Sequence, residues 1–165
     1  MTAPGLPRRG LLATGLALSL ATLAPGASRA ATGRMVGFLS DFDEVDDAVA
    51  ICRAVILSLA PDARLLDITH RVPPYDVAAG ARLLAGSAPW LADDAVIIIV
   101  VDPGVGSARR AIVARTRRGQ GLVLPDNGLV TLLDVADPIV AAREITAEAW
   151  MIGARRSSTF HGRDI

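Results

Sequence analysis

The chain has 165 residues, which suits one ordinary domain, and 52% of them are hydrophobic, so there is enough apolar material for a buried core. Its 17 basic residues balance 17 acidic ones. This balance argues against the basic stripe of a nucleic-acid-binding protein and against a polybasic membrane patch. The single cysteine cannot form an internal disulfide and is expected to be buried in a helix.

Residues 1–30 are interpreted as a signal peptide. Arg8 and Arg9 precede an apolar run at 11–24, and small residues follow around Ser28 and Ala30. The run is short for a membrane span, and its flanks and arginine pair favour a twin-arginine export signal over the alternative of an uncleaved anchor. We expect cleavage near Ala30, and export to the periplasm or medium without membrane association after cleavage.

The rest of the chain alternates between the periods of strands and helices. In chain order the pattern predicts a strand at 35–39, a helix at 45–59, a strand at 63–68, a helix at about 77–84, and strands at 95–101, 111–116, 121–125 and 141–145. The β-branched run at 95–101 is typical of a strand buried on both faces. This order predicts one α/β domain, residues 31–165, with a mostly parallel sheet flanked by helices.

Polar residues follow the ends of several predicted strands. Asp41 follows the first strand, Asp67 and His70 lie at the second, Asp102 follows the third, and the turn 125–128 follows a later one. Each alone could be a helix cap or a turn former. Because ligands bind beyond the carboxyl ends of parallel strands, the set predicts a site at one edge of the sheet.

The stretch "VDPGVGSARR" at 101–110 is the most informative motif. Gly104 and Gly106 permit a tight turn that brings Arg109 and Arg110 back towards Asp102. An arginine beside a carboxylate keeps it ionised and fixes its orientation. A purely structural salt bridge is the alternative, and the segment lacks the lysine and hydroxyl of a P-loop.

The acidic stretch "SDFDEVDDAVA" at 40–50 has three interpretations. Its carboxylates could complement a helix dipole, or they could bind a metal as in calcium-dependent nucleoside hydrolases, although the spacing is one residue short. In the third interpretation only Asp41 has a task, which is to accept hydrogen bonds from a ribose diol.

Taken together, the motifs resemble those of one family. "FLSDFDEVDDAVA", "PDARLLDITHRVPPYDVAAGARLL", "IIIVVDPGVGSARRAIVART", "LPDNGLVTLL" and "SSTFHGRDI" occur in this order from residue 35 to 165. They resemble the S-adenosylmethionine (SAM) hydroxide adenosyltransferases, relatives of the fluorinase and chlorinase. The resemblance implies that SAM binds between an N-terminal α/β domain and the C-terminal β-barrel of a neighbouring subunit in a homotrimer, where water or hydroxide at ribose C5′ releases methionine and adenosine.

The resemblance also implies the roles of individual residues. Asp102, Arg109 and His161 match the catalytic aspartate, arginine and histidine, and tyrosines take the places of Asp102 and His161 in the halogenating relatives. For substrate binding, Asp41 matches the ribose-binding aspartate, and Asp46, Tyr75 and Asn127 match positions near the methionine end, at the flanking aromatic and in the "DNG" stretch.

The chemistry suits these residues without a metal or cofactor. The sulfonium of SAM leaves as a neutral thioether, so only the water nucleophile needs help. Asp102 and His161 can act as proton acceptors, and Arg109 can offset hydroxide charge. Two residues depart from the family pattern, because Asp43 stands at a usual glycine and Ala48 at a position that is often larger or hydroxylated.

The chain stops at a motif that lies in the interior of family members, so we expect an N-terminal domain truncated at its C-terminal end, without the β-barrel, and with very low turnover of its own. Two alternatives to a SAM hydrolase remain. One is a non-catalytic module for adenosyl binding or assembly, and the other is a calcium-dependent nucleoside hydrolase.

Overall fold

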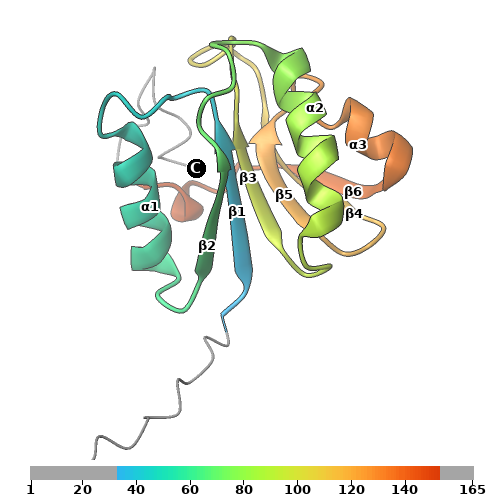
Figure 1. Cartoon of the computed structure of the whole chain (residues 1–165), viewed down its shortest axis with the longest axis horizontal. Helices are drawn as coiled ribbons and strands as arrows, with labels where there is room; N and C mark the ends of the chain where they lie inside the picture. The colour runs from blue at the N-terminus through green and yellow to red at the C-terminus, as the bar shows by residue number, and fades with distance from the viewer. Residues whose placement is uncertain (1–32, 153–165) are drawn as a thin grey trace, which may run out of the picture. The chain divides into compact units, whose positions relative to one another are not determined.

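A computed structural model describes residues 33–152 of the chain. Both the expected signal peptide and His161 lie outside these residues. The described part contains a six-stranded sheet in the order β2-β1-β3-β5-β4-β6 (Figure 1). The strands are β1 (Met35–Ser40), β2 (Arg64–Thr69), β3 (Val96–Val100), β4 (Ala111–Thr116), β5 (Gly121–Pro125) and β6 (Ile139–Glu144).

Five of these six strands run in the same direction. β1 pairs in parallel with β2 and β3, and β3 pairs in parallel with β5. β4 is antiparallel to both β5 and β6, so β6 again points the same way as β5. The predicted mostly parallel α/β sheet is therefore confirmed, with β4 as the reversed strand.

Helices cover both faces of the sheet, because the strands expose apolar side chains alternately to each side. On β3, Ile97 and Ile99 join the larger core with α2 (Val77–Ser87) and α3 (Thr131–Ala136). Ile98 and Val100 point to the other face, where α1 (Ala48–Leu59) contributes Val49 and Cys52. Figure 1 shows α2 and α3 on one face and α1 on the other.

Two helices differ from the sequence prediction. α1 begins at Ala48 rather than at 45, because Asp43 has a left-handed backbone with φ of 60° and the Asp46 carboxylate accepts a hydrogen bond from the Ala48 N–H at 2.9 Å. α3 was not predicted at all, since its six residues are too few to display a helical period. Two single 3₁₀ turns, η1 (Ala88–Trp90) and η2 (Glu148–Trp150), were also not predicted.

Among the residues that the structure describes, no helix is both long and apolar enough to cross a membrane.

Candidate functional site

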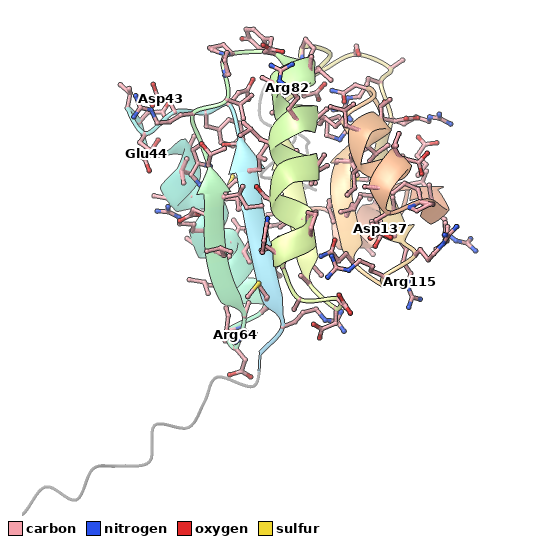
Figure 2. The ribbon with its side chains drawn as sticks, turned by 45° about the vertical axis from the view of Figure 1, so that its right-hand side comes forward. Asp43, Glu44, Arg64, Arg82, Arg115 and Asp137 are labelled. Carbon is pink, nitrogen blue, oxygen red and sulfur yellow. The ribbon has the colours of Figure 1, made fainter. Side chains whose placement is uncertain are left out.

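The strand directions bring the polar segments to one edge of the sheet. β1, β3 and β5 end at Ser40, Val100 and Pro125, and reversed β4 begins at Ala111 on the same side. This carboxyl edge therefore carries the segments with Asp41, Asp102, Arg109 and Asn127. Figure 2 shows Asp43 and Glu44 where β1 and β2 end and Arg64 at the opposite edge, where β2 starts.

Asp102 and Arg109 form a forked, nearly buried ion pair. Arg109 Nε donates to Asp102 Oδ1 at 3.0 Å, and Nη2 donates to Oδ2. The two side chains are 7% and 12% exposed, respectively. The Gly104 N–H also donates to Oδ1 at 3.0 Å. Two parallel hydrogen bonds and one backbone donor hold the carboxylate in a single orientation.

The turn between β3 and β4 produces this pair. The Val105 N–H donates to the Asp102 carbonyl at 3.3 Å, and the Ser107 N–H donates to the Gly104 carbonyl at 3.1 Å. Gly106 has a φ of 78°, which only glycine adopts without strain. The chain thus reverses within a few residues and returns Arg109 to Asp102, as the sequence predicted. Arg110 does not return to Asp102 but pairs with Asp126 in the next turn.

Asn127 lies beside this pair and has a fixed amide orientation. Its Nδ2 donates to the Val101 carbonyl at 2.9 Å, and because a carbonyl only accepts, the amide cannot be reversed. Its Oδ1 is buried without a hydrogen-bond donor among residues 33–152. A buried carbonyl without a partner costs about 1–3 kcal/mol, so this oxygen holds a hydrogen-bonding capacity that residues 33–152 leave unused.

Asp41 and Tyr75 also meet at the carboxyl edge. The Tyr75 N–H donates to Asp41 Oδ2 at 2.8 Å, and the Asp41 N–H donates to the Val100 carbonyl at 3.2 Å. Tyr75 has a φ of 63°, and its side chain is exposed. Such backbone strain in a non-glycine residue persists where the surroundings fix it, often at binding sites. These contacts join Asp41 to the end of β3 and to the loop that precedes α2.

The acidic stretch uses its carboxylates on backbone donors. Asp46 Oδ1 accepts the Ala48 N–H, and Asp43 Oδ1 accepts the Glu44 N–H at 2.7 Å. Within residues 33–152, no three His, Cys, Asp or Glu side chains gather so that they could hold a metal ion. The nucleoside hydrolase alternative, which depended on this stretch, therefore gains no support from the described residues.

A polar chain, buried at Ser40 and His70 and partly exposed to solvent at Asp67 and Arg53, stands next to Asp41, and the sequence indicated it only in part. His70 Nδ1 lies 2.8 Å from Ser40 Oγ, and His70 Nε2 lies 3.0 Å from Asp67 Oδ1. Arg53 of α1 binds both carboxylate oxygens of Asp67. Asp67 and His70 were marked as strand-end residues, but Ser40 and Arg53 were not. No local signal links Arg53 to a carboxylate in a strand 14 residues away.

The charges in this polar chain shift the pKa values of Asp67 and Arg53. Burial alone would raise the pKa of Asp67, but hydrogen bonds from Arg53 and His70 outweigh it and hold that pKa below its ordinary value. The hydrogen bond to Asp67 raises the pKa of Arg53. Asp67 is therefore ionised near neutral pH and accepts hydrogen bonds from both neighbours.

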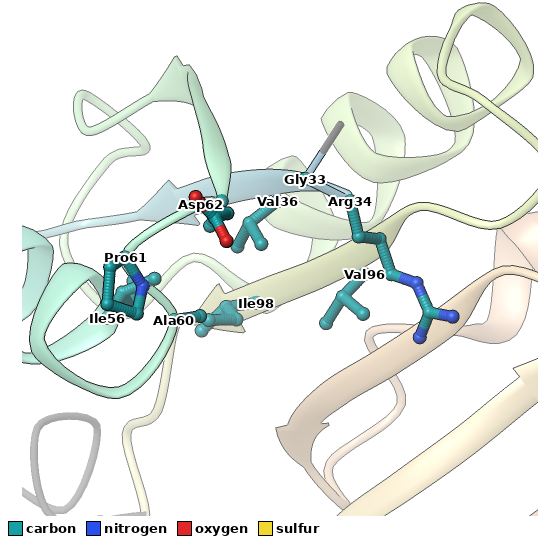
Figure 3. A pocket seen from close by; sticks show the side chains of 10 residues that line it. Gly33, Arg34, Val36, Ile56, Ala60, Pro61, Asp62, Val96 and Ile98 are labelled. Carbon is teal, nitrogen blue, oxygen red and sulfur yellow. The ribbon is translucent and has the colours of Figure 1, made fainter. Parts of the chain in front are cut away.

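An open pocket of about 470 Å³ lies at the other edge of the sheet. Val36, Ile56 and Ile98 contribute to its floor, with Arg34 and Asp62 at its margin (Figure 3). Its lining contains none of the predicted site residues, so the pocket and the candidate site are separate.

The sequence as a whole matches one protein family. Residues 36–165 match the family described as the SAM hydroxide adenosyltransferase N-terminal domain. The chain belongs to this family, as the motifs predicted.

Curated relatives and solved structures agree with this assignment. An (R)-S-adenosyl-L-methionine hydrolase of Salinispora arenicola is 50% identical over 133 residues, which cover 79% of this chain and 49% of that protein. One of Thermus thermophilus is 41% identical over 80% of this chain and 53% of its own length. A fluorinase of an Actinoplanes species is 26% identical, again over 79% of this chain and 51% of its own.

The fold matches as well. The crystal structure of a conserved protein from Thermotoga maritima superposes with a TM-score of 0.78 and 37% identity, over 79% of this chain and 51% of that one. The chain thus spans about half the length of the relatives that it matches.

Proposed function

We propose that this chain binds SAM at the carboxyl edge of its sheet and contributes the residues that hydrolyse it to adenosine and L-methionine. The observation that carries the proposal is the oriented, nearly buried Asp102–Arg109 pair, which follows the strand next to the one that Asp41 follows. A family in which relatives are named SAM hydrolases supports it.

The proposed reaction is an in-line displacement at ribose C5′. A water oxygen forms a bond to C5′ as the C5′–S bond breaks, and the electron pair of that bond passes to sulfur, so methionine leaves as a neutral thioether. The water loses one proton, so the site must accept a proton and not supply one. We assign this task to Asp102 together with His161, while Arg109 holds the Asp102 carboxylate and offsets the charge of the nascent hydroxide. The proposal requires no metal ion or cofactor.

The remaining residues are proposed to bind the substrate. We assign the ribose diol to Asp41, stacking or flanking contacts to Tyr75, and the methionine ammonium to Asp46. We assign Asn127 to substrate binding from its place in the "DNG" stretch, where its amide is fixed against the Val101 carbonyl.

We propose that the whole protein works as a homotrimer. We also propose that it is exported after cleavage near Ala30. N-terminal mass spectrometry of the mature protein checks the cleavage, and an intact Met1 in a cytoplasmic fraction would refute the signal peptide.

Chromatographic detection of adenosine in mixtures of the whole protein and SAM tests the proposed reaction. Asp102→Asn keeps the side chain's shape but removes its negative charge, and we expect adenosine formation to fall by about 10²-fold or more. Asp94→Asn, at an exposed aspartate whose contact with Arg34 is long, should change nothing. Equal activity of the wild type and Asp102→Asn would refute the role of Asp102.

Calorimetry with SAM separates the hydrolase from a non-catalytic module. Binding of SAM without adenosine formation at any enzyme concentration would favour the adenosyl-binding alternative. Absence of both would contradict the proposed function itself.

A further inference from the structure

We infer that the polar chain Ser40–His70–Asp67–Arg53 positions the loop 41–47, and that His70 is the central positioning residue of this polar chain. None of its four members is assigned to catalysis or to substrate binding above. Where the inference concerns ligand affinity, it rests on the proposed function.

The polar chain has a direction that the chemistry of its groups determines. A carboxylate only accepts, so the contact of 3.0 Å assigns the donor role to the Nε2–H of His70, with Asp67 Oδ1 as acceptor. In this tautomer the other ring nitrogen, Nδ1, accepts the Ser40 O–H at 2.8 Å. Ser40 Oγ in turn accepts the backbone N–H of Phe42 at 3.4 Å. Each donor in this series, from the Phe42 N–H through the Ser40 O–H to the His70 Nε2–H, thus has an acceptor.

His70 also holds the loop through its backbone. The Asp43 N–H donates to the His70 carbonyl at 2.7 Å, and the Val72 N–H donates to the Ser40 carbonyl at 3.4 Å. Arg53 attaches the same network to α1, the helix that the loop enters. Contacts with the end of β2 therefore hold the residue before the loop, the loop itself and the helix after it. Asp41 lies between Ser40 and Asp43, which both make such contacts, so these contacts fix the position of Asp41.

Burial makes these contacts specific. Ser40 is fully buried and His70 is 3% exposed, and the His70 ring packs edge-on against Phe38 with centroids 4.6 Å apart. Serine, histidine and aspartate in a row resemble a nucleophilic triad, but a substrate cannot reach a serine that has no exposed surface. Positioning is the role that remains, since a buried polar network with matched partners fixes a single arrangement.

Three variants separate the hydrogen bonds of the polar chain. Ser40→Ala removes the acceptor of the Phe42 N–H with little change in volume. His70→Gln keeps a donor for Asp67 but does not reach Ser40, whereas His70→Asn keeps an acceptor near Ser40 and loses Asp67. Thr116→Val is the matched control, because Thr116 is 1% exposed and its hydroxyl accepts the Gln120 N–H at 3.2 Å at the other edge of the sheet.

Amide hydrogen exchange over residues 42–44, read together with the dissociation constant for SAM, tests the inference. We expect Ser40→Ala and His70→Gln to speed exchange in this segment roughly tenfold. His70→Asn should keep much of the wild-type protection, and Thr116→Val should leave the segment unchanged. The dissociation constant for SAM should rise most in Ser40→Ala and His70→Gln, less in His70→Asn and not in Thr116→Val.

Unchanged exchange in the segment would overturn the inference, and so would an equal rise throughout the sheet, which indicates a merely structural role. A wild-type protein that does not bind SAM would count against the proposed function, and the exchange pattern would still decide the positioning role.

Discussion

Asp43 occupies a backbone conformation that glycine adopts more easily. Its φ is 60°, and its carboxylate accepts the N–H of the next residue, Glu44. Aspartate is among the few residues that tolerate this region. The motif resemblance indicated that relatives carry glycine here, and the structure gives the physical reason for that preference.

Substitutions at Asp43 should follow from this conformation. Asp43→Gly should change the free energy of unfolding by less than about 1 kcal/mol, because relief of strain offsets the greater freedom of the unfolded chain. Asp43→Val should lower it by about 1–3 kcal/mol, since a β-branched residue is strained at positive φ. Urea denaturation measures both, and a Val variant as stable as the Gly variant would show that the loop adapts its backbone.

The ion pair of Asp67 should make stability depend on pH in the acid range. The pKa of Asp67 is lowered in the folded protein, so its contribution is fully present above the unfolded pKa of about 3.9 and is lost as the pH falls through the folded value. Solvent weakens the effect, because the Asp67 side chain is 35% exposed.

The variant Asp67→Asn isolates this contribution. Its deficit in the free energy of unfolding, relative to the wild type, should be present at pH 7 and shrink towards pH 3. Asp94→Asn, at a largely exposed carboxylate, should show a small difference at both pH values. A deficit of Asp67→Asn that stays constant with pH would mean that shape, not charge, accounts for it.

The sequence predicted single site residues better than their partners. Asp102 and Arg109 are seven positions apart across a glycine-containing turn, so their pairing follows from local chain geometry. The contacts of Asp41 with the Tyr75 N–H and of Asn127 with the Val101 carbonyl join segments 34 and 26 positions apart. Such contacts depend on the order of strands in the sheet, which periodicity does not contain.

The helices show the same limit. α2 was predicted from its apolar period, and Asp76 fixes its start by accepting the Ala79 N–H at 2.8 Å. The start of α1 was predicted three residues too early, because Val45 continues the apolar spacing although it is 89% exposed in the loop. α3 packs its buried Leu133 in the larger core, so tertiary contacts stabilise this short helix more than its own propensity does.

Capping at the two longer helices gives a matched pair of variants. Asp76→Ala should lower the free energy of unfolding by about 1 kcal/mol, because the Ala79 N–H loses its partner. Asp47→Ala should cost only a few tenths of a kcal/mol by weakening the helix dipole interaction, since the Asp47 side chain makes no capping hydrogen bond. Thermal unfolding of both variants checks this, and equal costs would contradict the assignment of the cap.

Because five strands share one direction, the carboxyl and amino edges of the sheet carry different features. The carboxyl edge gathers the ion pair, the buried amide oxygen of Asn127 and the partly buried polar chain, whereas the amino edge holds an open pocket with apolar side chains. Among residues 33–152, the residues proposed for the chemistry therefore lie at the carboxyl edge. The sequence predicted a site there, because strand-end positions determine it once the sheet is parallel, but it did not predict the pocket.

This arrangement leads us to expect water, and not a halide, as the nucleophile of the proposed reaction. A halide needs a site without an adjacent anion, but the Asp102 carboxylate places a negative charge there, held by Arg109 Nε and Nη2. This carboxylate can accept a proton from water and has none to give to chloride. With SAM and excess chloride, the products of the whole protein should be adenosine and methionine. Chromatography distinguishes adenosine from 5′-chloro-5′-deoxyadenosine, and the chlorinated nucleoside as main product would overturn the expectation while leaving the binding of SAM intact.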